Sequence, residues 1–192
     1  ACAPFRRLHL CDKYIQQIKT ENITTYNLLV DVCLAAKHEG ESIIQDYPKK
    51  YVATYGDSLS KMCTMLARSF ADIGDIIRGK DLFIGNNKRD KLEKQLKKYF
   101  QKIYDNLVDA AKNHYNGDTK NYYQLREDWW YANRRQVWKA ITCNAGGYQY
   151  FRQTACSGGT SPTHQKCTCA TNDVPTYFDY VPQYLRWFEE WA

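Results

Sequence analysis

The stretch from residue 90 to residue 115 reads DKLEKQLKKYFQKIYDNLVDAAKNHY and carries the clearest structural signal of the chain. Its apolar residues recur every three or four positions, which is the spacing of one helix face, at Leu92, Leu96, Tyr99, Ile103, Leu107 and Ala110. Asn116 and Gly117 follow, and this dipeptide commonly ends a helix. The pattern predicts one long amphipathic helix over residues 90–115.

The same period predicts helices on both sides of this stretch. Their ranges are Tyr26 to Gln45, Leu59 to Ile77, about Asn121 to Ile141, and a short helix that begins near Pro182. We expect Pro48 to end the first helix, Asp57 or Ser58 to cap the second, and Gly79 to follow its end. Long amphipathic helices in this number predict an all-α fold built as a helical bundle.

The composition describes a folded domain. The chain has 192 residues, of which 44% are hydrophobic and 15% aromatic, well above the content of disordered chains. No apolar run approaches the roughly 18 residues that a membrane helix needs. The first residues lack an initiator Met, a basic segment and an apolar segment, so we expect the chain to be part of a larger protein.

Cysteine spacing indicates the compartment. No CxxC pair or zinc-type Cys/His spacing occurs, so we predict disulfides rather than metal at Cys2, Cys11, Cys33, Cys63, Cys143, Cys156, Cys167 and Cys169. Disulfides persist in oxidising surroundings, which places the folded chain outside a cell or in a secretory lumen. Eight cysteines allow 105 pairings, and the sequence does not choose among them.

Two regions lack a helical period. We expect residues 1–25, which contain Cys2 and Cys11, to form an irregular N-terminal lead-in. The segment 143–175 is rich in Gly, Ser, Thr and Asn and holds four of the cysteines, so we predict a long Cys-rich loop whose base is held by disulfides. We expect Cys143, Cys156, Cys167 and Cys169 to be oxidised there.

Positive charge is concentrated in one segment. Residues 88–102 contain only two acidic residues, Asp90 and Glu93. The same range contains seven basic residues, which are Lys88, Arg89, Lys91, Lys94, Lys97, Lys98 and Lys102. Lys91, Lys94, Lys98 and Lys102 are three, four and four residues apart, so on a helix they form one row, about 120° around from the apolar face. A row of this kind suits a linear polyanion.

Two interpretations of this row remain open. In an extracellular setting the polyanion would be a sulfated glycan, and nucleic acid is not an expected partner. The alternative is a solvated lysine face that keeps the protein soluble. Retention on heparin that depends on Lys91, Lys94 and Lys98 would favour the glycan.

The remaining conspicuous residues predict packing rather than chemistry. Helical spacing predicts a core role for Trp129, Trp130, Trp138, Trp187, Phe188 and Trp191. Because Trp129 and Trp130 are adjacent, we expect one of them to lie near the surface or under another element. The four histidines are scattered, and no HExxH, GxSxG, GxxxxGK[ST] or GxGxxG motif occurs. We expect no enzymatic activity, no cofactor and no metal.

Four blocks of sequence carry a family resemblance. They are CAPFRRLHLCD at 2–12, ARSFADIGDIIRGKD at 67–81, LREDWW through NR to VWKAITC at 125–143, and PTYFDYVPQYLRWFEEW at 175–191. In content and order they resemble the Duffy-binding-like domain, alpha class, of the Plasmodium falciparum erythrocyte membrane protein family. The resemblance spans the whole chain.

The resemblance implies a position within a three-subdomain adhesion module. Residues 1–25 would be the loop-rich end of the first subdomain, and residues 26–192 the helical second subdomain with the Cys-rich loop 143–175. The third subdomain would lie outside the chain, which leaves open whether Cys2 and Cys11 have partners within it. Loops such as 144–170 and the stretch 82–121 would carry antigenic variation.

The resemblance also implies a function. The chain would be an adhesion module of a variant surface antigen, exported to the extracellular face of the infected erythrocyte membrane and anchored in that membrane outside this chain. Implied partners are a host cell-surface receptor or a sulfated glycan such as heparan sulfate, with rosetting as one outcome, and host antibodies. The alternative is a structural spacer and immune decoy whose neighbouring domains bind the receptor.

Overall fold

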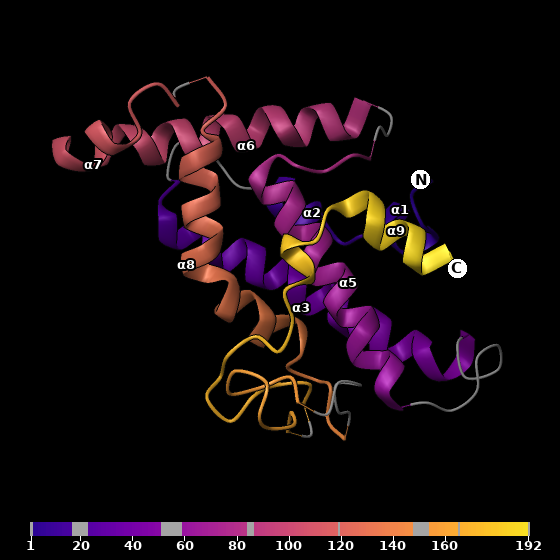
Figure 1. Ribbon diagram of the computed structural model, residues 1–192. Coiled ribbons are helices and arrows are strands. Elements are labelled where there is room, and N and C mark those ends of the chain that lie inside the picture. Colours follow the sequence, from indigo (N-terminus) through magenta and orange to yellow (C-terminus); the bar gives the residue numbers. More distant parts are fainter. Residues whose placement is uncertain are drawn as a thin grey trace.

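The computed structural model describes residues 2–16, 23–50, 59–83, 87–118, 120–147, 154–164 and 166–191 (Figure 1). Its helices are α1 (Phe5–Leu8), α2 (Lys13–Gln16), α3 (Thr25–Lys50), α5 (Leu59–Arg78), α6 (Asn87–Asp105), α7 (Asp109–His114), α8 (Tyr123–Ile141), the 3-10 turn η2 (Phe178–Tyr180) and α9 (Gln183–Trp191). These parts contain no strand, only the isolated bridges Cys156 to Ser161 and His164 to Thr168. The predicted all-α class is confirmed.

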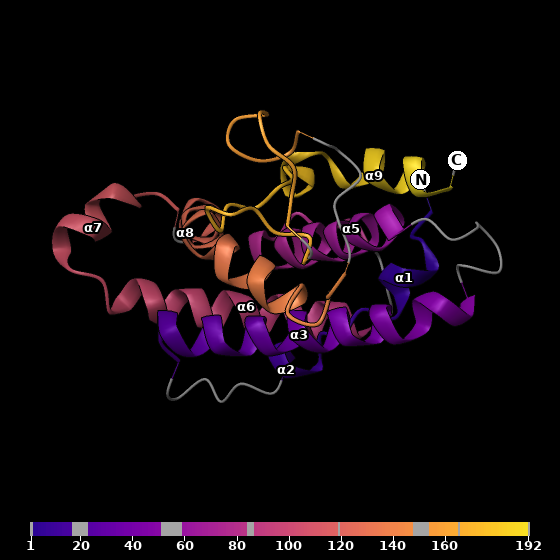
Figure 2. The same ribbon diagram turned by 90° about the horizontal axis from the view of Figure 1, so that it is seen from below.

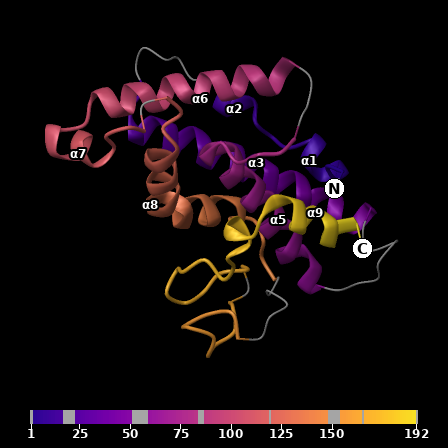
Figure 3. The same ribbon diagram turned by 45° about the horizontal axis from the view of Figure 1, so that its top comes forward.

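The long helices pack around α8. It lies against α3 and α5, which also contact each other, while its first turns meet α6 (Figure 1). The Cys-rich segment after α8 lies at the end of α8 away from α6. Figure 2 shows α7 projecting at one end of the molecule, beyond α6. Both chain ends lie at the other end, beside α1 and α9 (Figure 3).

The end of α5 is fixed by a glycine, as predicted. Gly79 has φ +72°, the left-handed conformation that glycine adopts without steric cost. Its N–H donates to the carbonyl of Ile76 and that of Lys80 to the carbonyl of Asp75, which is the Schellman arrangement. A Cβ at residue 79 would lie 2.9 Å from Arg126 Nη1, so α8 also passes close to this turn.

Two predicted helix boundaries are wrong. The single helix over 90–115 is broken into α6 and α7, and Val108 between them is extended at φ −69° and ψ 155°. Asn106, Val108 and Asp109 are weak helix formers, and Asp109 instead begins a new helix, where its charge suits the N-terminus. α3 continues past Pro48 to Lys50, because a proline in the last turn removes only one backbone hydrogen bond.

The core contains four of the five tryptophans. Trp129, Trp130, Trp138 and Trp187 are buried, as predicted. The adjacent Trp129 and Trp130 point in different directions and lie under different neighbouring helices, which is one of the two arrangements expected for this pair. Trp129 packs edge-on against Phe100 of α6, and Trp130 packs against α5, where a Cβ on Gly74 would come within 2.7 Å of its ring.

The C-terminal helix buries only one of its faces. Helix α9 contacts α5 and its Trp187 is buried, whereas Phe188 and Trp191 are 71% and 61% exposed. Their predicted inward orientation is therefore wrong. Helix α9 lies on the outside of the bundle, and no described element covers its outer face.

Two disulfides hold the Cys-rich segment. Cys63–Cys167 joins it to α5, and Cys156–Cys169 closes it on itself. Free thiols occur in this structure at Cys2, Cys11, Cys33 and Cys143. The predicted disulfides at Cys33 and at Cys143 of the Cys-rich loop are therefore wrong, while Cys2 and Cys11 are the two whose partners the resemblance left in doubt. These thiols sit on separate elements, namely the lead-in, α3 and the turn after α8. Burial raises the pKa of Cys33 to about 11, so this thiol is protonated at neutral pH.

Candidate polyanion-binding face

The predicted lysine row lies on α6. Lys91, Lys94 and Lys98 are exposed and Lys102 is half-buried, and these four residues are called the lysine face below. Lys97 points more to the side, where it lines a cavity of about 720 Å³ together with Lys13 and Arg7. The side chains of Lys88 and Arg89 lie outside the described part of the chain. The structure thus groups four of the seven predicted residues on one surface.

The apolar face of α6 anchors the helix. It is buried through Leu92, Leu96, Tyr99, Phe100 and Ile103. The hydroxyl of Tyr99 donates to the carbonyl of Ile15 at 3.2 Å, which ties α6 to α2. Because the apolar face is fixed in this way, the lysine face points outward on a rigid element.

An ion pair removes one acid from this surface. Arg126 of α8 binds Glu93 with two hydrogen bonds, Nη1 to Oε1 at 2.8 Å and Nη2 to Oε2 at 2.9 Å. The same guanidinium donates to the last carbonyls of α5, at Ile76 and Ile77. Arg126 is fully buried, so the charge of Glu93 is balanced from beneath the surface by this guanidinium.

The lysines of α6 keep their charge available. Among the described residues none of the four lysines of the face forms an ion pair with an acid. Asp90 is exposed in the first turn and is the remaining acid of the 88–102 segment. Unpaired ammonium groups in a row produce a positive potential that is screened over about 10 Å at 0.1 M salt. Such a row attracts extended anions rather than small ones.

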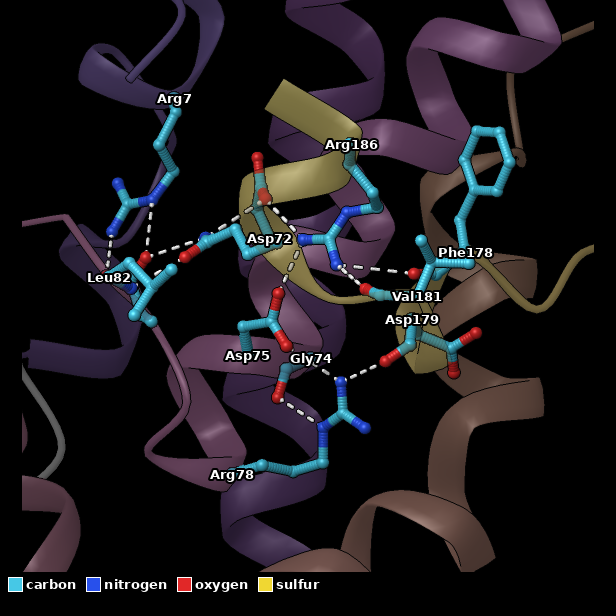
Figure 4. Close-up of polar contacts among 12 residues, drawn as sticks. Arg7, Asp72, Gly74, Asp75, Arg78, Leu82, Phe178, Asp179, Val181 and Arg186 are labelled. Carbon is cyan, nitrogen blue, oxygen red and sulfur yellow. Dashed lines mark hydrogen bonds and ion pairs between the residues drawn. The ribbon is translucent and has the colours of Figure 1, made fainter. Parts of the chain in front are cut away.

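A second charged region is buried and was not predicted from the sequence. Arg186 of α9 donates to Asp72 and Asp75 of α5 and to the carbonyls of Phe178 and Val181 (Figure 4). Arg78 donates to Asp75 at 2.9 Å and to the carbonyl of Asp179. All the acids and arginines of this group are buried. They join α5, η2 and α9, and they act as internal fasteners.

Asp179 and the N-terminal lead-in extend this network. Asp179 accepts two hydrogen bonds from Arg134, each 2.7 Å long, and one from Trp130 Nε1 at 2.9 Å. Arg6 of α1 reaches Asp72 at 2.8 Å and Glu190 of α9 at 2.9 Å. We call the buried arginines Arg6, Arg78, Arg134 and Arg186, with the acids that they bind, the arginine network.

Burial and ion pairing have opposite effects on the pKa values of the carboxyl groups in this network. Burial raises the pKa of Asp75 to about 6, although Arg186 and Arg78 favour its charged form. At Asp72 burial acts in the same direction, but Arg6 and Arg186 outweigh it and lower the pKa of that carboxyl. The sequence offered one signal for the network: Asp72, Asp75 and Arg78 occur within the apolar period of α5.

The other candidate residues are dispersed. Of the histidines, His9, His38, His114 and His164 lie on different elements. No group of three metal-binding side chains is found in the described segments. Within those segments no helix combines the length and the apolar character required to cross a membrane.

Comparison with known proteins connects these features to a family. A family model for the Duffy binding domain matches residues 1–186. The structure of an NTS-DBL1α1 domain of Plasmodium falciparum membrane protein 1, varO strain, superposes with a TM-score of 0.84 and 46% identity, and the match covers 100% of this chain and 43% of that one. No curated protein sequence matches the chain.

Beta-type domains are also similar, at lower identity. A DBLβ domain of PfEMP1 from the same organism, solved bound to human ICAM-1, has a TM-score of 0.74 and 33% identity, and the match covers 97% of this chain and 38% of that one. The chain thus spans less than half of these relatives. With a family match over nearly its full length, the chain belongs to the Duffy binding domain family, and its similarity to alpha-type PfEMP1 domains agrees with the resemblance drawn from its sequence.

Proposed function

We propose that the chain is a binding module of an adhesin that attaches to host cells. We further propose that the lysine face of α6 binds a sulfated glycan of the heparan sulfate type. The observation that carries the glycan proposal is the exposure of Lys91, Lys94 and Lys98 in one row, with the charge of nearby Glu93 balanced by Arg126. Sulfates along a glycan chain are spaced anions, and a rigid helix presents matching cations.

Family membership supports the adhesion part of this proposal. A relative with 33% identity was solved in complex with human ICAM-1. For the present chain the corresponding role is attachment to a host cell-surface receptor from the extracellular face of the infected erythrocyte. Rosetting of red cells and recognition by host antibodies are consequences that we propose for the intact adhesin. The division into subdomains at residue 25 also remains a prediction.

Heparin affinity tests the glycan proposal. The refolded 192-residue chain is expected to remain on heparin at about 0.15 M salt. Replacing Lys91, Lys94 and Lys98 by Ala is expected to weaken binding about tenfold or more, because each exposed contact contributes up to about 1 kcal/mol.

A charge-matched variant serves as the control. Lys120, Lys139 and Lys166 are also exposed but lie on other elements, and their replacement by Ala removes the same net charge. This control is expected to retain nearly full heparin affinity. Equal losses in both variants would mean that heparin responds only to net charge, and the proposal of a site on α6 would be wrong.

The same experiment separates adhesion from a spacer role. A chain that binds neither heparin nor red cells at physiological salt would be the structural spacer and immune decoy. Binding of red cells without heparin binding would instead keep the adhesion proposal and place its receptor elsewhere on the surface.

A further inference from the structure

The cavity beside the Cys-rich segment lies away from the lysine face. It has a volume of about 690 Å³ and is bordered by Tyr131 and Arg135 of α8, by Gly158 of the loop, and by Asp173, Tyr177 and Tyr180. Its volume falls in the range of roughly 300–1,000 Å³ that ligand pockets have. The Cys-rich segment that borders it lies at the end of α8 away from α6 (Figure 1).

Three exposed tyrosines form its aromatic walls. Tyr131 and Tyr177 are 73% and 72% exposed, and Tyr180 is 42% exposed. Large aromatic side chains with this exposure are candidates for an interface, because each loses much apolar surface when covered.

The rings of Tyr177 and Tyr180 are held in place from beneath. The guanidinium of Arg134 lies 5.4 Å from the ring centroid of Tyr177 and 5.5 Å from that of Tyr180. Arg134 is itself fixed by Asp179 and by the carbonyl of Thr176. Two of the aromatic walls are therefore ordered before any ligand arrives, which lowers the entropy cost of binding.

The charge of the cavity does not suit a polyanion. Arg134 is balanced by Asp179, and Arg135 is paired with Asp173. These pairs leave no net positive charge on the lining comparable to that of the lysine face. The ligand expected here is uncharged over most of its length.

The hydrogen-bonding groups of the cavity further restrict the class of ligand that it can bind. Asp173 accepts from Arg135 with one oxygen and from the Thr171 hydroxyl with the other at 2.8 Å, so both of its oxygens are engaged. By contrast, within the described segments the hydroxyls of Tyr131, Tyr177 and Tyr180 donate to no protein group. The cavity therefore offers aromatic faces and hydroxyl groups that can donate to acceptors of a ligand.

A proline-rich segment has the complementary chemistry. Proline carries no backbone N–H, and a polyproline II helix leaves its carbonyls unpaired and directed outward as acceptors. Its ring surfaces pack on aromatic side chains, and its preformed backbone loses little entropy on binding. We infer that the tyrosine cavity binds a proline-rich, extended segment of a partner protein. This site is separate from the lysine face and does not depend on glycan binding.

Titration of the refolded 192-residue chain with acetylated decaproline tests this inference, with a Gly-Ser decapeptide as the negative probe. Decaproline is expected to bind, with little dependence on salt, and the Gly-Ser peptide is not. Tyr177→Ala is expected to weaken binding about tenfold, since it removes both a ring contact and a donor. Tyr177→Phe keeps the ring and is expected to weaken binding about threefold.

Two controls make the result decisive. The exposed position of Tyr177 means that both substitutions should leave the helical circular dichroism unchanged. The variant with Lys91, Lys94 and Lys98 replaced by Ala is expected to bind decaproline as the wild type does, which separates this site from the glycan proposal. The inference is overturned if the folded wild type does not bind decaproline, or if Tyr177→Ala binds it equally well. Binding of lactose through these tyrosines in place of decaproline would assign the cavity to a sugar and also overturn it.

Discussion

The arginine network and the lysine face carry the same kind of charge in opposite surroundings. Arg78, Arg134 and Arg186 are buried and engage several acceptors each, whereas no lysine in the described parts of the chain is buried. A planar guanidinium with five donors satisfies several acceptors at once, while an ammonium is strongly hydrated and keeps to the surface. The buried arginines of the network therefore fasten helices to one another, whereas the exposed lysines of the lysine face remain available for partners.

The largest expected loss of stability comes from a substitution in the buried arginine network. Asp179→Ala removes the carboxylate that holds Arg134 and Trp130, and it leaves a buried guanidinium uncompensated. We expect the free energy of unfolding to fall by about 3–5 kcal/mol. Denaturant unfolding followed by circular dichroism measures this loss.

Asp173→Ala is the matched control. Asp173 also pairs with an arginine, Arg135, but at the exposed surface, so its loss should cost under about 1 kcal/mol. Similar losses in the two variants would mean that burial does not determine how the domain uses its ion pairs.

The two disulfides are expected to stabilise the domain by different amounts. Cys63–Cys167 joins residues 104 positions apart and ties the Cys-rich segment to the core, so we expect its replacement by serines to cost about 2–4 kcal/mol. Cys156–Cys169 closes only 13 positions, and its loss should cost roughly 2 kcal/mol less, because loop-closure entropy grows with length. Thermal unfolding of the two double variants compares them, and a larger loss for the short loop would contradict this ranking.

Acid should act on the arginine network in a specific direction. Burial raises the pKa of Asp75 to about 6 in the folded chain, above its ordinary value of 3.8, so the folded state binds a proton before the unfolded state does. Folding stability contributed by this group therefore increases as pH falls from 7 toward 4. We expect the wild type to gain on the order of 1–2 kcal/mol relative to Asp75→Asn between pH 7 and pH 5. A stability difference that does not change with pH would contradict the assignment.

Asp72 should show the opposite dependence at lower pH. Burial disfavours its charge, but Arg6 and Arg186 outweigh this and hold its pKa below 3.8. The stabilisation that it contributes is present above the unfolded pKa and is lost as pH falls through the folded value. Comparing wild type with Asp72→Asn below pH 4 would measure it.

The smallest expected effect concerns the lysine face. Replacing Lys91, Lys94 and Lys98 by Ala should change the free energy of unfolding by less than about 0.5 kcal/mol, because these side chains make no ion pair within the described chain. The same substitutions are expected to weaken heparin binding strongly. A large loss of stability would mean that these lysines belong to the scaffold.

The sequence was informative where a periodic pattern coincides with local chemistry. The apolar period located α3, α5, α6 and α8, and Gly79 marked the end of α5, because these features depend on neighbouring residues alone. The exposed lysine row followed from the same period. The break at Val108 was missed, since the apolar spacing continues across it through Leu107 and Ala110.

Long-range pairings could not be predicted in this way. Arg186 meets Asp72 across 114 positions, and no local spacing encodes that contact. The pairing of Cys63 with Cys167 across 104 positions is equally non-local. The exposure of Phe188 and Trp191 depends on what covers α9, which its own amphipathic spacing does not reveal.

Lysine footprinting tests the central claim most directly, without any mutation. The refolded chain is acetylated briefly with and without a heparin oligosaccharide, and the modified lysines are quantified by mass spectrometry. The account predicts protection of Lys91, Lys94 and Lys98, while Lys120, Lys139 and Lys166 react as before. Protection of the second group alone, or equal protection of both, would contradict the assignment of the polyanion site to α6.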